Sequence, residues 1–163
     1  QFTQSEIGAD IAEALSAAGL RPDRLVVEIT ESLLLNDNKD TLETLRGLKA
    51  LGIEIAMDDF GTGYSSLSYL RNYPFDRIKI DRAFVSTASQ GDQAAAIIRT
   101  IVQLGNSLGM TTVAEGVETE KHLEMVMAAG CSEGQGYLFS RAVPRDQVFA
   151  LLAKLQRKIS LVA

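Results

Sequence analysis

The chain has very few of the residues that form disulfides and soft metal sites. Among 163 residues there is one cysteine, Cys131, one histidine, His122, and no tryptophan. A single cysteine excludes an internal disulfide, and one cysteine with one histidine cannot supply a Cys/His zinc cluster. Any metal ion held by this sequence must therefore have oxygen ligands. Hydrolysis by a Ser/His or Cys/His pair also has little support, because no nucleophile is paired with His122.

Long apolar stretches and basic clusters are also missing. The longest apolar runs, such as residues 94–98, fall far short of the roughly 20 residues that span a bilayer. The 21 acidic residues outnumber the 16 basic ones, for a net charge of -5. No Lys/Arg-rich stretch offers a groove that could follow the phosphates of DNA or RNA. The composition is typical of one ordinary globular domain that does not bind polymeric nucleic acid.

Hydrophobic periodicity and turn residues predict an alternation of strands and helices. Strands are expected at residues 25–30, 53–58, 77–80, 111–114 and 134–139. Helices are expected at residues 5–18, 37–51, 65–72, 92–108, 119–129 and 145–155. Short connections between alternating elements imply parallel strands covered by helices, in an α/β fold. The fold is then either a doubly wound sheet or a TIM-like (β/α) barrel.

Ionisable residues gather at the carboxyl ends of four predicted strands. They are Glu28, Asp58 with Asp59, Lys79 and Glu115. A barrel collects catalytic groups from several strand ends at one mouth, whereas an open sheet uses a single crevice. The pattern therefore favours the barrel. Five βα units of a nominal eight would place three strands before Gln1, so we expect this sequence to be a fragment of a longer domain.

Four carboxylates with only Lys79 to offset them would repel one another unless a cation neutralises them. Hard oxygen ligands favour Mg²⁺, Mn²⁺ or Ca²⁺, and paired ions suit phosphodiester hydrolysis. Lys79 could stabilise the phosphorane or hold the attacking water, and Glu115 could accept its proton. The pattern equally fits a structural interpretation, in which Asp59 is a turn residue, Glu118 begins a helix and Lys79 is solvated.

Two apparent motifs carry no function. Asp59-Phe60-Gly61 has the letters of a kinase motif, but no other kinase motif accompanies it. Glu13-Ala14-Leu15 lies in the middle of a predicted amphipathic helix, where a metal ligand at a strand end could not be.

Five segments, taken together, resemble the EAL-domain cyclic di-GMP phosphodiesterases in order and spacing. They are Glu28-Ile29-Thr30-Glu31, the nine residues from Asp58 to Ser66, Lys79-Ile80-Asp81-Arg82, Ala114 to Glu118, and Gln135-Gly136-Tyr137. The resemblance covers residues 1 to about 155. It implies a barrel that cleaves cyclic di-GMP to linear pGpG with two Mg²⁺ or Mn²⁺ ions.

The resemblance also implies roles for individual residues. Metal ligands would be Glu28, Asp58, Asp59 and Glu115, with Lys79 near the attacking water and Glu115 as the metal-linked or general-base glutamate. Glu118 and Gln135 would lie near the substrate. A loop that links metal binding to a dimer interface would comprise Glu31, Phe60, Gly61, Thr62, Gly63 and Tyr64, which implies a homodimer.

Two departures from the family pattern stand out. The signature EAL glutamate and an Asn ligand would precede Gln1, so we expect this chain alone to be inactive and, with open barrel edges, to dimerise, aggregate or swap. Ala142 replaces the family's usual proline. The resemblance further implies a bacterial cytoplasmic domain preceded by a sensory or GGDEF-type domain, in a parent that can be membrane-anchored. The rival hypothesis is a degenerate EAL domain that binds cyclic di-GMP, or a protein partner, without cleavage.

Overall fold

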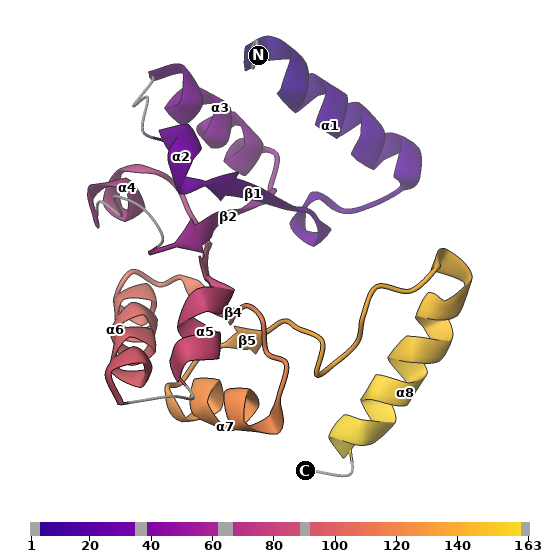
Figure 1. Ribbon diagram of the computed structural model, residues 1–163. Helices are drawn as coiled ribbons and strands as arrows, with labels where there is room; N and C mark the ends of the chain where they lie inside the picture. Colours follow the sequence, from indigo (N-terminus) through magenta and orange to yellow (C-terminus); the bar gives the residue numbers. More distant parts are fainter. Residues whose placement is uncertain (1–3, 35–38, 62–66, 89–91, 161–163) are drawn as a thin grey trace.

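The computed structural model describes residues 4–34, 39–61, 67–88 and 92–160. Strands and helices alternate through them, as the sequence predicts (Figure 1). The strands are β1 (Val26–Thr30), β2 (Glu54–Phe60), β3 (Arg77–Ile80), β4 (Thr111–Ala114) and β5 (Glu133–Gly134). The helices are α1 (Gln4–Ala18), α2 (Glu31–Leu34), α3 (Lys39–Ala50), α4 (Leu67–Asn72), α5 (Arg82–Ala88), α6 (Asp92–Ser107), α7 (Glu120–Ala128) and α8 (Val148–Ser160), with 3-10 turns η1 (Pro22–Arg24) and η2 (Arg145–Gln147).

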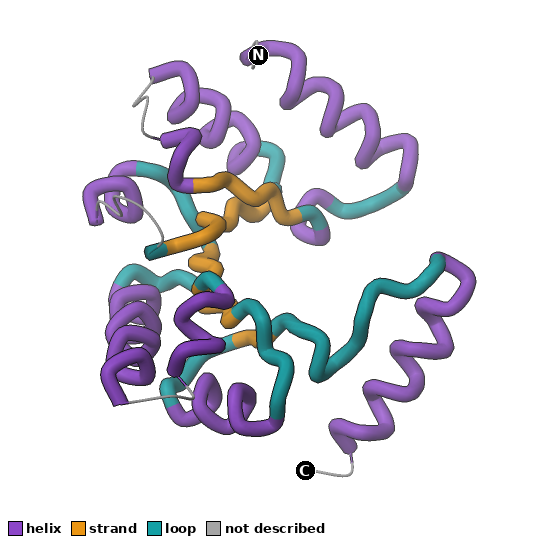
Figure 2. Tube along the Cα trace, viewed as in Figure 1, coloured by secondary structure: helices purple, strands orange, loops and turns teal. Residues whose placement is uncertain are grey.

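The five strands form one parallel sheet whose spatial order, β1-β2-β3-β4-β5, is the order along the chain. Figure 2 shows the strands grouped in the middle of the molecule, with helices around them. A doubly wound sheet would show a point where the strand order reverses. No reversal occurs among the described strands, so the arrangement is that of a TIM-like barrel and the doubly wound alternative is set aside. All five strands therefore end at the same edge of the sheet.

The hydrophobic core lies between the sheet and the helices outside it. On β2 and β3 the outward-facing residues Ile55, Met57, Ile78 and Ile80 are fully buried. Helix α6 packs on β3 and β4. Because strand side chains alternate between faces, the residues between these positions point to the opposite, inner face. That inner face carries the ionisable residues, so these side chains lie on the opposite side of the sheet from the hydrophobic core.

The structure corrects the prediction at five elements. The short helices α2 and α5 were not expected, because four and seven residues are too few to display a helical period. β2 continues to Phe60. The last strand has two residues, Glu133–Gly134, because the chain then turns and Phe139 N donates to Gly136 O at 3.1 Å. The final helix begins at Val148 and not at residue 145.

Among the described helices, none has both the length and the apolar character needed to cross a membrane.

Candidate active site

Lys79 lies at the centre of the carboxylates that the sequence singles out. Its Nζ is 2.8 Å from Glu28 Oε2, 2.8 Å from Asp58 Oδ1 and 2.8 Å from Glu115 Oε1. Glu28 comes from β1, Asp58 from β2 and Lys79 from β3, and Glu115 directly follows β4. Four neighbouring parallel strands thus direct side chains from the same edge of the sheet to one point, as the alternation pattern predicts.

The ammonium group of Lys79 is held in its charged form. The side chain is only 8% exposed, and this burial lowers its pKa. Hydrogen bonds to Asp58, Glu115 and Glu28 more than compensate, so the pKa of Lys79 is raised above its ordinary value. One positive charge is therefore shared by three carboxylates at neutral pH, which leaves the cluster with an excess of negative charge.

Asp59 joins this cluster because the strand is irregular at its end. With regular alternation Asp59 would point away from Asp58, to the outer face. Instead Asp59 has a φ of 54°, in the left-handed region, and the pairing of β2 with β3 shifts register between Met57 and Phe60. Among non-glycine residues, aspartate and asparagine adopt this conformation most readily. The bulge brings the Asp59 carboxylate to the same face of the sheet as the Asp58 carboxylate.

Three carboxylates form a set that fits a divalent cation. One oxygen from each of Asp58, Asp59 and Glu115 lies within 4.8 Å of the others. Burial, followed by the charges of Asp58 and Asp81, raises the pKa of Asp59. Oxygen-only donors suit Mg²⁺, Mn²⁺ or Ca²⁺. In this structure Glu28 lies outside the set of three and contributes its ion pair with Lys79.

A small pocket adjoins Glu115 and contains both predicted substrate residues. Its volume is about 190 Å³ and its lining is Arg82, Glu115, Gly116, Glu118, Gln135, Gly136 and Tyr137. Gln135 is held by a hydrogen bond from its backbone N to Ala114 O at 2.8 Å. The guanidinium of Arg141 stacks over the Tyr137 ring, 4.2 Å from its centroid. No role was expected for Arg82, Tyr137 or Arg141, because nothing in their spacing along the chain shows that Arg82 and Tyr137 line one pocket or that Arg141 stacks on Tyr137.

The structural interpretation of Glu118 is not borne out by the helix that follows it. Helix α7 is capped by Thr119, whose Oγ1 accepts a hydrogen bond from His122 N at 3.1 Å. Glu118 N donates to His122 Nδ1 at 3.4 Å. His122 is buried and takes part in the packing of this turn. Because Thr119 caps the helix, the Glu118 side chain is not the cap, and Glu118 lines the pocket.

The predicted loop residues are only partly described. Phe60 ends β2 and is buried, and Glu31 is buried at the start of α2. Gly61 has a φ of 95°, and a Cβ there would lie 2.8 Å from the Phe84 ring, so this position requires glycine. Thr62, Gly63 and Tyr64 lie outside the described residues. The coupling of this loop to a dimer interface stays a prediction.

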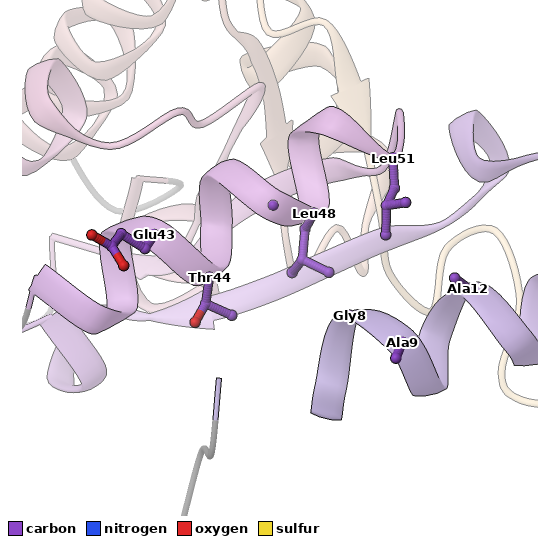
Figure 3. Close-up of a pocket in the computed structure, with 8 residues that line it drawn as sticks. Gly8, Ala9, Ala12, Glu43, Thr44, Leu48 and Leu51 are labelled. Carbon is purple, nitrogen blue, oxygen red and sulfur yellow. The ribbon is translucent and has the colours of Figure 1, made fainter. Parts of the chain in front are cut away.

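A larger groove lies between helices α1 and α3, away from the carboxyl ends of the strands (Figure 3). Its volume is about 500 Å³ and its lining is Gly8, Ala9, Ala12, Glu43, Thr44, Gly47, Leu48 and Leu51. Glu43 is the one ionisable residue in this lining. The groove has no cluster of groups that could perform hydrolysis, so it is not the candidate active site.

Comparison with known proteins identifies the family. The sequence model of the EAL domain matches residues 1–142. The bifunctional diguanylate cyclase/cyclic di-GMP phosphodiesterase MucR of Pseudomonas aeruginosa is 41% identical over 153 residues, which is 94% of this chain and 22% of MucR. The chain thus spans about a fifth of the length of that relative.

Solved structures agree with this assignment. The EAL domain of Mycobacterium smegmatis DcpA matches with a TM-score of 0.87 at 38% identity, covering 94% of this chain and 69% of that one. Klebsiella pneumoniae BlrP1, solved with manganese and cyclic di-GMP, matches with a TM-score of 0.80 at 36% identity, covering 86% of this chain and 36% of that one. On the family match, the sequence identity and the shared fold, this chain belongs to the EAL domain family.

Proposed function

We propose that this chain forms part of a metal-dependent phosphodiesterase domain that hydrolyses cyclic di-GMP to linear pGpG. The observation that carries the proposal is the convergence of three carboxylates on the Lys79 ammonium, each at 2.8 Å, beside the set formed by Asp58, Asp59 and Glu115. The relatives support the choice of substrate: MucR is named as a cyclic di-GMP phosphodiesterase, and its phosphodiesterase part has been solved with cyclic di-GMP.

Asp58, Asp59 and Glu115 are the residues proposed to hold Mg²⁺ or Mn²⁺, with Glu28 as a further ligand. Divalent ions at such a site stabilise charge on the phosphoryl oxygens and make water a better nucleophile at neutral pH. BlrP1 supports the choice of metal, because its structures contain manganese or calcium together with cyclic di-GMP.

Lys79 and Glu115 are the residues proposed to act on the reacting atoms. The charged Lys79 ammonium can hold the attacking water or stabilise the phosphorane oxygens. Glu115 can accept the proton that the water loses. The water oxygen forms a new bond to phosphorus, the bond from phosphorus to the 3′ oxygen breaks, and that oxygen takes up a proton. One such event opens the ring and yields pGpG.

Glu118 and Gln135 are proposed to bind parts of the dinucleotide beyond the reacting phosphate. They line the pocket of about 190 Å³ that Glu115 also borders. A carboxylate and a carboxamide there can pair with the hydrogen-bonding edge of a guanine. The exposed ring of Tyr137 at the same pocket can stack on a base.

The test is the hydrolysis of cyclic di-GMP by the intact protein in which this sequence occurs, with Mn²⁺ and with chromatographic identification of the product. Glu28→Ala and Asp58→Ala should each abolish pGpG formation. Glu13→Ala is the matched control, because Glu13 is an exposed carboxylate on α1, away from the strand ends. It should leave the rate unchanged.

Two results would contradict the proposal. If the intact protein binds cyclic di-GMP but forms no pGpG, the domain is a receptor that has kept the architecture of the enzyme. If pGpG forms at the wild-type rate in Glu28→Ala and Asp58→Ala, the hydrolysis occurs at a different site.

A further inference from the structure

A second ionic cluster lies on the inner face of the sheet, one step below Lys79. Arg77 precedes Lys79 by two residues on β3, so the two side chains share a face. Arg77 Nε is 2.6 Å from Glu54 Oε2, and Arg77 Nη1 is 2.8 Å from Glu133 Oε2. The Arg77 side chain is 22% exposed. We call Arg77, Glu54 and Glu133 the lower ionic cluster.

The lower ionic cluster joins three strands, and its Arg77–Glu133 ion pair joins two strands that are not neighbours. Glu54 belongs to β2, Arg77 to β3 and Glu133 to β5, while the register partner of Arg77 on β4 is Thr111. One guanidinium therefore reaches past β4 to the last strand. The planar fork of arginine fixes two carboxylates in definite directions, which a lysine cannot do.

β5 is the shortest of the described strands, so an additional side-chain contact constrains it most. It has only two residues, paired with Val113 and Ala114 of β4. Its continuation, residues 135–138, is held by three backbone hydrogen bonds: Gln135 N to Ala114 O at 2.8 Å, Val117 N to Gln135 O at 3.0 Å and Leu138 N to Val117 O at 3.0 Å. Two-residue pairing leaves an element easily displaced, so a side-chain tie from β3 adds a constraint that the ladder lacks.

Displacement of β5 would move one wall of the pocket in the candidate active site. Gln135 follows Glu133 by two residues and, with Gly136 and Tyr137, forms one wall of the pocket that Glu115 borders. The opposite side of the site, formed by Lys79 and its carboxylates, is anchored in β1 to β4. The distance between this wall and the reacting groups is therefore set by how β5 is held.

We infer that Arg77 is a positioning residue for substrate binding: through Glu133 it fixes β5, and with it Gln135 and the pocket wall, at the right distance from Glu115. The inference rests on the proposed function, since it concerns the wall that would bind the dinucleotide. Partly exposed ion pairs contribute little to global stability, so the cluster acts on local geometry.

The test measures steady-state kinetics of cyclic di-GMP hydrolysis by the intact protein with Mn²⁺. Arg77→Met should raise KM by about five- to tenfold, with kcat within about twofold of wild type. Substrate binding is weakened, whereas the reacting groups are unchanged. The Mn²⁺ concentration for half-maximal activity should not change. Arg77→Lys should raise KM almost as much, because one ammonium cannot reproduce the two-pronged contact.

Coupling and a matched control make the test specific. Glu133→Gln should raise KM similarly, and the double variant with Arg77→Met should be no worse than either single variant. Lys49→Met removes an ion pair of similar exposure, Lys49 Nζ to Asp76 Oδ1 at 2.6 Å, which does not reach β5. Its KM should equal that of wild type. An equal KM rise in Lys49→Met, a parallel loss of kcat in Arg77→Met, or additive effects in the double variant would overturn the inference.

Amide hydrogen exchange separates this inference from the proposed function. If wild type forms no pGpG, the proposed function fails. The effect of the Arg77–Glu133 ion pair on β5 can still be measured from the exchange rate of the Gln135 amide. That amide should exchange at least about fivefold faster in Arg77→Met than in Lys49→Met. Equal exchange in the two variants would overturn the positioning role.

Discussion

At the scale of single residues, the charge balance of the site depends on Lys79. Its ammonium neutralises part of a cluster in which three carboxylates approach it to 2.8 Å. The Lys79 side chain is buried, and Asp58 and Glu115 are partly buried beside it. Removing the ammonium would leave the negative charge of these carboxylates uncompensated. This gives Lys79 a structural effect that is separate from any part in hydrolysis.

Lys79→Met should therefore lower the free energy of unfolding, by about 3 kcal/mol, the lower end of the range for one partner of a buried pair, since Glu28 is half exposed. A group whose pKa is raised on folding contributes stability that is fully present below its unfolded pKa and is lost only as pH rises through the folded value. The difference between Lys79→Met and wild type, measured by urea unfolding, should thus be constant between about pH 6 and pH 9. A difference that disappears by pH 9 would show that Lys79 loses its proton there.

Asp59 offers a test of the metal site that leaves the backbone intact. Asparagine adopts the left-handed conformation as readily as aspartate, so Asp59→Asn should preserve the bulge at φ 54° while removing one negative ligand. Affinity for Mn²⁺, measured by calorimetry, should fall at least about tenfold. Glu13→Gln removes a charge from exposed α1 and should leave the affinity unchanged. Equal affinities for Asp59→Asn and wild type would remove Asp59 from the ligand set.

The sequence predicts the placement of some site residues but not of others. Alternation along strands predicts that Glu28, Asp58, Lys79 and Glu115 share a face, and the ion pairs bear this out. The orientation of Asp59 was beyond prediction, because a register shift leaves no trace in the hydrophobic pattern. The contact of Arg77 with Glu133 was missed for another reason: the two residues are 56 positions apart.

At the scale of elements, the turn after β5 is the feature that shapes the pocket. Gly136 lies against the backbone of Val117, so closely that a Cβ at this position would overlap it. The sequence pattern predicts a strand over residues 134–139, but only Gln135 N continues the pairing, by donating to Ala114 O. The backbone N–H groups of Leu138 and Phe139 donate instead to Val117 O and to Gly136 O within the turn. Glycine at position 136 allows two backbones to approach, and a pattern of apolar residues cannot reveal that requirement.

Gly136→Ala should destabilise the domain by about 1–3 kcal/mol, because backbone has to move to admit the methyl group. Gly47→Ala is the matched control: it lies within α3, and a Cβ there meets nothing within 4 Å. This control should stabilise by about 0.5–1 kcal/mol, since alanine is the better helix former. Urea unfolding of both variants is the measurement. A neutral Gly136→Ala would mean that the turn is not packed as described.

At the scale of the whole molecule, the strand order explains why the site can form. Five parallel strands follow one another in space as they do in the chain, so their carboxyl ends, and the residues placed there, meet at one edge. The sequence could predict this architecture because long helices and buried strands carry strong periodicity. The short helices α2 and α5 were not predicted, and the predicted bounds of β5 were wrong, because such short elements depend on tertiary contacts.

The most direct test of the central claim is metal removal and replacement. The intact protein, treated with EDTA and desalted, is assayed for pGpG formation from cyclic di-GMP before and after addition of Mn²⁺. We expect no product without the ion, restored hydrolysis with it, and no restoration in Asp58→Asn. Formation of pGpG by the metal-free protein, or full restoration in Asp58→Asn, would contradict a metal-dependent site built on these carboxylates.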